Sequence, residues 1–249
     1  MLELQRLSKH FGGVRAVDSV DLKVARGEIL GLIGPNGSGK STIVNLICGL
    51  FPLTAGRVTF NGEDISQLPP HERVTAGIAR TFQNIRLFGQ LTVWRNLWVA
   101  QNSAQQRQEN PFRRWLGGAG RAREEIGQVL EFFDLAHKRD ELAGNLSFGE
   151  QRRLEFARAF SANPALLLLD EPAAGMNAEE IDQLDVRIRK VRESGMAVLL
   201  IEHHMELVMA VADRIAVLNF GRKIAEGTPV EVQADPLVRE AYLGTAAAA

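Results

Sequence analysis

The segment that most restricts the fold is Gly34–Ser41, GPNGSGKS, which stands between a short apolar run at 29–33 and a helical pattern at 40–50. It matches the spacing G-x-x-x-x-G-K-[ST] in full. Its glycines let the backbone curl so that N–H groups face an anion, and a helix beginning near Lys40 adds the positive end of its dipole. The sequence therefore predicts a strand, a phosphate-binding loop and a helix in succession. A glycine-rich turn without function is the alternative.

A second apolar run, LLLLDEP at 166–172, predicts the other half of this site. Four consecutive leucines are too apolar for a half-exposed strand, so we expect a central strand of a parallel sheet. The strand would deliver Asp170 and Glu171 at its carboxyl end, where open α/β sheets bind their ligands. Beside a phosphate loop, Asp170 is expected to hold Mg²⁺ and Glu171 to act as general base on the attacking water. Lys40 would reach the β- and γ-phosphates, and the Ser41 hydroxyl would ligate Mg²⁺.

The remaining pattern predicts an α/β fold with helices on both faces of a mainly parallel sheet. Strands are expected within 2–33, and the region 84–162 is mostly helical except for an interruption at 108–120. We read this helical middle as an inserted subdomain. Further strands are expected at 58–60, 78–82, 166–170 and 197–201, helices at 71–76, 179–194 and 205–212, and a hairpin at 214–226.

Composition excludes several classes of protein. The net charge of −1 provides no basic field for nucleic acid, and the single cysteine, Cys48, excludes an internal disulfide. Cys48 lies in an apolar helical run and is expected to be a small buried hydrophobe. No apolar run approaches the ~18 residues of a membrane-spanning helix, and the N-terminus lacks the apolar core of a signal peptide. We expect a soluble, cytoplasmic chain with a frayed tail at 246–249.

The segment LSFGEQRRLEFARAF at 146–160 predicts a helix that begins near Ser147. Ser147 and Glu150 have the spacing of a capping box, and Leu154, Ala157 and Phe160 recur at helical spacing. Taken alone, this segment is an ordinary capped amphipathic helix. Its position between the phosphate loop and LLLLDEP indicates a functional role besides packing.

The phosphate loop, LSFGE, LLLLDEP and a later strand-end histidine, in this order, resemble the nucleotide-binding subunit of an ABC transporter. The resemblance covers essentially the whole chain. It implies a P-loop NTPase with a RecA-like core, an antiparallel β part and a helical subdomain, all in one ATPase domain over 1–245. The core would occupy 1–83 and 163–228, the helical subdomain 84–162 and a helical tail 229–245. Two such subunits would pack head to tail around two ATP molecules.

The resemblance also implies roles for single residues. Ser147 and Gly149 would contact the γ-phosphate held by the partner's phosphate loop, and Gln83 would lie near Mg²⁺, the attacking water and the membrane partner. Phe11 would stack on adenine, and residues 174–177 would cross the dimer seam. The loop residues expected to bind the nucleotide are Gly34, Pro35, Asn36, Gly37, Ser38, Gly39, Lys40, Ser41 and Thr42.

Two departures from the family pattern leave alternatives open. The common LSGGQ is LSFGE here, so Phe148 and Glu150 are substitutions, and Glu150 either contacts ATP or only caps its own helix. The expected switch histidine has a neighbour, so the choice lies between His203 and His204. We favour His203, which directly follows the strand, as the catalytic residue that reaches the γ-phosphate. His204 would then be an exposed residue that opens the next helix.

Less universal segments narrow the resemblance to ATPases of branched-chain amino acid importers. These segments are 79–100, 146–159, 170–177, 199–209 and 241–244. Close relatives of those ATPases serve urea or short amides, and a lipopolysaccharide-exporter ATPase is a more distant relative. The implied partners are a second ABC ATPase, identical or related, a transmembrane permease and, indirectly, an external substrate-binding protein, at the inner face of the cell membrane. A soluble ABC-type ATPase acting on another assembly and an exporter ATPase are the alternatives.

Two surface segments carry weaker hypotheses. Residues 107–123 are rich in arginine and are either a solvated loop or a contact with the permease or with lipid headgroups. Residues 84–91, with Leu87 and Phe88, either form a groove for a short permease helix or belong to the core. Trp94 and Trp98 are expected to pack on one helix face.

Overall fold

A six-stranded sheet forms the centre of the molecule in the computed structural model, which describes residues 1–105 and 111–243. Its strand order is β10-β9-β3-β8-β7-β6. The pairs between β9, β3, β8, β7 and β6 are parallel, and only the β9–β10 hairpin is antiparallel. The strands are β3 (Ile29–Ile33), β6 (Ile78–Arg80), β7 (Leu166–Asp170), β8 (Ala197–Ile201), β9 (Arg214–Asn219) and β10 (Arg222–Gly227).

Alternate residues of the central strands face two separate cores. In β7, Leu166 and Leu168 pack into one hydrophobic cluster, whereas Leu167 and Leu169 pack into the other. All four leucines are fully buried. The continuous apolar run is thus explained by burial on both faces of a parallel sheet, as the sequence predicts.

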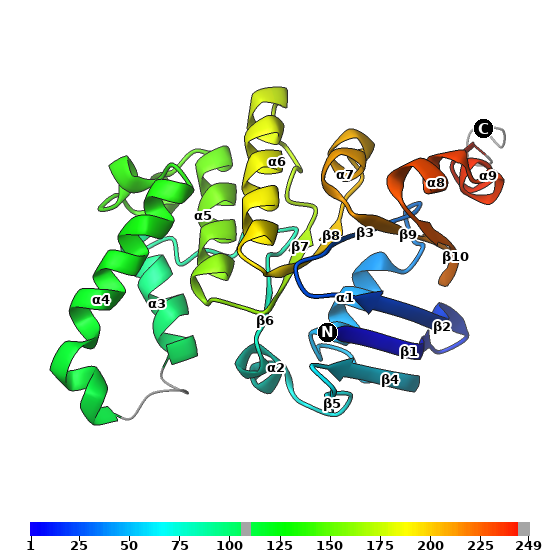
Figure 1. Cartoon of the computed structure of the whole chain (residues 1–249), viewed down its shortest axis with the longest axis horizontal. Helices are drawn as coiled ribbons and strands as arrows, with labels where there is room; N and C mark the ends of the chain where they lie inside the picture. The colour runs from blue at the N-terminus through cyan, green and yellow to red at the C-terminus, as the bar shows by residue number, and fades with distance from the viewer. Residues whose placement is uncertain (106–110, 244–249) are drawn as a thin grey trace.

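One face of this sheet is covered by α1 (Lys40–Ile47), which lies between it and a second sheet (Figure 1). The second sheet is antiparallel, with the order β2-β1-β4-β5. Its strands are β1 (Leu2–Phe11), β2 (Val14–Val24), β4 (Ala55–Phe60) and β5 (Glu63–Asp64). The predicted alternation in β2 is confirmed, because Val20, Leu22 and Val24 are buried.

The other face is covered by helices, and one group of them extends away from the sheet on the left of Figure 1. This helical part contains α3 (Val93–Gln105), α4 (Pro111–Phe132) and α5 (Phe148–Ser161). The remaining helices are α2 (Pro70–Ala76), α6 (Ala178–Glu193), α7 (Met205–Val211), α8 (Pro229–Ala234) and α9 (Pro236–Leu243). None of the helices in the described part of the chain is both long and apolar enough to cross a bilayer.

The expected interruption at 108–120 is wrong for its larger part, because α4 begins at Pro111 and runs through the three glycines of that segment. Proline suits the first turn of a helix, where its missing N–H is not needed. Each interior glycine costs only about 1 kcal/mol of helix stability, and Ile126 and Leu130 anchor the later turns in the core. The residues 106–110 lie outside the described part of the chain.

An aromatic cluster joins the helical part to the rest of the core. The ring of Phe133, fully buried just after α4, lies edge-on to Phe132 and Phe156 at centroid distances of 4.9 Å each. Phe160 lies 5.8 Å from the same ring. Because Phe156 and Phe160 belong to α5, this cluster fixes α5 against the end of α4.

We expect Phe133→Ala to destabilise the protein by about 3–5 kcal/mol, because it removes a fully buried ring and leaves a cavity. Denaturant unfolding followed by circular dichroism measures the effect. Phe220→Ala is the control, because Phe220 is 86% exposed and its loss should leave the midpoint unchanged. Equal midpoints for the two variants would contradict this role of the cluster.

Candidate functional site

The loop between β3 and α1 has a backbone that only glycine can adopt at two positions. Gly34 and Gly39 have φ values of 147° and 105°. A Cβ at Gly34 would lie 2.1 Å from the Leu218 carbonyl oxygen, and one at Gly39 would lie 2.4 Å from that of Ala16. The loop is therefore pressed against β9 and β2, which fixes its path.

Lys40 folds back over this loop. Its side chain is 5% exposed, and Nζ donates hydrogen bonds to the carbonyl oxygens of Gly34 and Pro35 at 2.7 and 3.0 Å. Burial lowers the pKa of Lys40, and the carboxylates of Glu171 and Asp170 oppose that shift. The loop thus encloses a cation close to the two acidic residues at the end of β7.

Other loop side chains are free to take a ligand. The Ser38 hydroxyl is buried and has no hydrogen-bond partner among the described residues. Ser41 is exposed and Thr42 half-buried in the first turn of α1. A buried unpaired hydroxyl beside an enclosed ammonium group fits an anion such as a phosphate, which would satisfy both.

Asp170 is held by an ion pair that sequence reasoning missed. Its Oδ2 accepts a hydrogen bond of 2.7 Å from Nη2 of Arg80, and both side chains are largely buried. Arg80 also donates to Asn45 of α1 at 2.6 Å. Arg80 ends β6, next to β7 in the sheet, so only the strand order reveals the pairing.

Glu171 lies at the centre of the acidic site. Its φ is 50°, in the left-handed region, where a non-glycine residue marks a strained position. Gln83 Nε2 donates a hydrogen bond of 2.7 Å to one carboxylate oxygen, and His203 Nε2 lies 2.9 Å from the other. The structure therefore brings together the three residues predicted to be catalytic. His204 instead is the exposed N-cap of α7.

Sequence reasoning also missed Glu202, which immediately precedes these histidines. Its buried carboxylate accepts hydrogen bonds from the backbone N–H groups of Ala173, His203 and His204 at 2.7, 2.9 and 3.2 Å. Glu202 thereby ties the end of β8 to the turn after Glu171. The signal in the sequence that could have identified Glu202 is its position directly after a buried strand.

The segment Leu146–Glu150, here called the LSFGE turn, begins α5 as predicted. Glu150 N donates to the Ser147 hydroxyl at 3.3 Å, and Ser147 N donates to the Glu150 carboxylate at 2.8 Å. Partial burial favours the neutral acid, but the bonds from Ser147 and the nearby Lys138 outweigh it and lower the pKa of Glu150. Glu150 therefore serves as a cap in this structure.

The LSFGE turn is not part of the phosphate loop of the same chain. It lies against the beginning of α6, where a Cβ at Gly149 would come within 2.1 Å of Glu180. Figure 1 shows α5 well separated from α1. Ser147 and Gly149 are thus not brought together with Lys40 within one chain.

Phe11 ends β1 and is 44% exposed. Its ring lies edge-on to Phe51 at 5.4 Å and 4.9 Å from the ammonium group of Lys9. An exposed aromatic ring is compatible with stacking on a base, and no contact in the structure tests this prediction.

The weaker surface hypotheses have mixed outcomes. Leu87 packs against the core, whereas Phe88 is 50% exposed beneath the guanidinium of Arg158. The rings of Trp94 and Trp98 stack at 6.3 Å on α3, as predicted. In the arginine-rich segment 107–123, residues from 111 onward are helical instead of a loop, and 107–110 lie outside the described residues.

Comparison with known proteins identifies the family. Residues 17–174 match the family model described as "ABC transporter", and residues 222–248 match that described as "Branched-chain amino acid ATP-binding cassette transporter". The chain is 42% identical to the high-affinity branched-chain amino acid transport ATP-binding protein BraF of Pseudomonas aeruginosa, over 99% of this chain and 98% of BraF. It is 40% identical to LivG of Escherichia coli, with the same coverage.

Further similarities extend to an export system and to solved structures. The lipopolysaccharide export system ATP-binding protein LptB of Escherichia coli is 38% identical over 98% of this chain and 97% of LptB. The ADP conformation of MJ1267, an ATP-binding cassette of an ABC transporter, superposes with a TM-score of 0.85 at 34% identity, covering 98% of each chain.

Cys48 offers a test of the environment behind the site, because it is the only cysteine of the chain. It is the C-cap of α1 and lies half-buried near Arg80. Burial raises the pKa of its thiol to about 11, although Arg80 opposes the shift.

We expect Cys48 in the native protein to be alkylated by iodoacetamide at pH 8 about 100-fold more slowly than in urea, because its thiolate fraction is correspondingly smaller. The native rate should rise as the pH approaches 11. Mass spectrometry of timed samples measures both rates. Equal rates in native and urea-denatured protein at pH 8 would contradict the buried environment.

Proposed function

This chain belongs to the ABC transporter family of ATP-binding cassettes, and from that premise we propose that it hydrolyses ATP to power the import of branched-chain amino acids. The observation that supports hydrolysis is the cluster of Gln83, Glu171 and His203 at the ends of adjacent strands. The observation that supports the cargo is the similarity to BraF and LivG over nearly the whole chain.

The phosphate loop is proposed to bind the phosphates of ATP. Lys40 would exchange its bonds to Gly34 and Pro35 for phosphate oxygens, and the unpaired Ser38 hydroxyl would gain an acceptor. Mg²⁺ would neutralise phosphate charge, and Ser41, Gln83 and Asp170 have the oxygen ligands that it prefers. Phe11 is proposed to stack on the adenine.

Glu171 is proposed to accept the proton of the attacking water. Both of its carboxylate oxygens are engaged, one by Gln83 and one by His203. Each of these oxygens has a second lone pair, which is available to a water. We infer that Gln83 and His203 orient the carboxylate and then exchange their contacts with it for contacts with the water and the γ-phosphate.

A second ATPase subunit is proposed to complete each site, because Ser147 and Gly149 stand apart from Lys40 in the same chain. Their helix N-terminus suits the γ-phosphate bound by the partner. The dimer would lie at the inner face of the membrane, where closure on ATP and reopening after hydrolysis would drive a transmembrane permease. An external binding protein would deliver the substrate to that permease. The single ATPase domain would span 1–245, with its helical subdomain at 84–162.

An exporter remains a second candidate because LptB is 38% identical. Copurification of the native membrane complex, followed by uptake of leucine, isoleucine and valine into vesicles that contain ATP, separates the two. We expect permease subunits of an importer and ATP-dependent uptake. Recovery of export components without amino acid uptake would overturn the proposed cargo.

We expect Glu171→Gln to bind ATP but to lose turnover, because the amide cannot accept the proton of water. The variant should accumulate as an ATP-bound dimer, measured by size-exclusion chromatography. Lys40→Ala is the control and should lose ATP affinity in a titration. Hydrolysis by Glu171→Gln near the wild-type rate would exclude Glu171 as the base.

If each site needs two chains, specific activity should rise steeply with protein concentration. ATPase rates measured across the range in which ultracentrifugation detects the monomer–dimer transition test this expectation. A specific activity that stays constant at concentrations where the protein is monomeric would contradict the shared site.

A further inference from the structure

Arg152 links the helix of the LSFGE turn to the segment that carries Gln83. It lies one turn into α5 and is 7% exposed. Nη1 donates a hydrogen bond of 3.0 Å to the carbonyl oxygen of Phe82, and Nη2 donates one of 2.6 Å to that of Gln83. The two arms of one guanidinium thus hold two consecutive backbone carbonyl groups.

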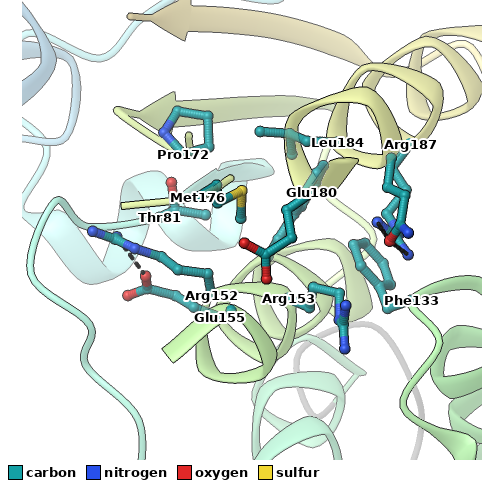
Figure 2. A pocket seen from close by; sticks show the side chains of 13 residues that line it. Thr81, Phe133, Arg152, Arg153, Glu155, Pro172, Met176, Glu180, Leu184 and Arg187 are labelled. Carbon is teal, nitrogen blue, oxygen red and sulfur yellow. Dashed lines mark hydrogen bonds and ion pairs between the residues drawn. The ribbon is translucent and has the colours of Figure 1, made fainter. Parts of the chain in front are cut away.

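Glu155 adds a second attachment from the same face of α5. It is 2% exposed, and its Oε1 accepts a hydrogen bond of 3.1 Å from the backbone N–H of Arg86. It also forms an ion pair of 3.6 Å with Arg152, drawn as a dashed line in Figure 2. Arg152 and Glu155 therefore bond to the two ends of the segment 82–86, which belongs to no helix or strand.

This attachment continues to the proposed base. The backbone of Gln83 is held by Arg152, and the side chain of Gln83 donates to Glu171 at 2.7 Å. Among the described residues, Arg152 bonds to the segment that carries Gln83 and to Glu155, but not to Glu171, and it lies on the helix whose N-cap is Ser147. A continuous series of bonded groups thus runs from α5 through Arg152 and Gln83 to the carboxylate.

The cavity beside Arg152 is too small for Arg152 to be the binding residue of a second ligand site. It lies between α5 and α6, lined by Arg152, Glu155, Met176 and Glu180 among others, as Figure 2 shows. Its volume of ≈ 20 Å³ admits about one water molecule. A buried guanidinium is stabilised here by carbonyl groups and Glu155, and no substrate-sized ligand fits.

We propose that Arg152 is a positioning residue that holds the Gln83 backbone so that the Gln83 amide orients Glu171. Through the same bonds it couples the position of the LSFGE turn to that of the base. This inference rests on the proposed hydrolysis at Glu171 and deepens it. The planar fork of arginine matches two adjacent carbonyl groups, whereas the single ammonium of lysine can satisfy them only in part.

The test is a double-mutant cycle of ATP hydrolysis with Arg152→Gln, Gln83→Ala and the two combined. Arg152→Gln should lower kcat about 10- to 100-fold, the effect expected from losing hydrogen bonds to a charged donor. KM for ATP should change less than twofold, because Arg152 does not touch the phosphate loop. In the Gln83→Ala background, Arg152→Gln should add little, because Arg152 acts through Gln83.

Arg189→Gln is the matched control. Arg189 also bonds a carboxylate, that of Asp185, and a backbone carbonyl group, that of Ala210, but on the outer surface of α6. Its kcat should stay at the wild-type value. Arg152→Lys should recover part of the lost kcat and, because it retains the charge, supports the same cycle if Arg152→Gln fails to fold.

Multiplicative losses in the double variant would overturn the proposal, because they would show that Arg152 acts independently of Gln83. A wild-type kcat for Arg152→Gln would overturn it as well. These outcomes differ from failure of the proposed function, in which Glu171→Gln itself would hydrolyse ATP. If Glu171→Gln abolishes hydrolysis while the losses of Arg152→Gln and Gln83→Ala multiply, the proposed function stands and only the role of Arg152 is refuted.

Discussion

The contact of the Glu171 carboxylate with Gln83 and His203 is the interaction on which the organisation of this site depends. The three residues come from widely separated positions of the chain, and they meet because β6, β7 and β8 are adjacent and parallel in the sheet. Parallel strands end at the same edge, so each delivers one side chain to one place. Burial of the β7 leucines on both faces therefore matters for the proposed site, because it fixes where Glu171 leaves the sheet.

Two charged residues behind this site bond to backbone groups of the segments around Glu171. Arg152 binds carbonyl oxygens of the segment that carries Gln83, while Glu202 accepts the N–H groups of His203, His204 and Ala173. A cation therefore secures one side of Glu171 and an anion secures the other. Because a buried charge is costly when it loses its partners, each of these residues restricts its loop to positions that keep those bonds. Such restriction suits the role that we propose for Gln83 and His203, which is to orient Glu171.

The sequence predicted those parts of the fold whose cause is local. The burial of LLLLDEP, the capping box at Ser147 and the glycine-dependent loop depend on residues close together in the chain. The break expected at 108–120 was wrong from residue 111 onward, because packing of later residues outweighs the glycine cost in α4. Arg80, Arg152 and Glu202 were missed for another reason. Arg80 and Asp170 are 90 positions apart, and no pattern in the chain shows which strands become neighbours.

The capping box also accounts for the unusual acid in the LSFGE turn. A carboxylate beside a phosphate would repel it, but Glu150 directs its charge to the backbone N–H of Ser147 and towards Lys138, 3.9 Å away. The negative charge of Glu150 is thereby stabilised by groups at the start of its own helix and by Lys138, which is why its pKa is lowered. The N–H groups in the first turn of α5, next to Ser147, remain suited to an anion. The substitution of glutamine by glutamate is thus compatible with the proposed contact to a partner's nucleotide, since the acid strengthens the cap that presents Ser147 and Gly149.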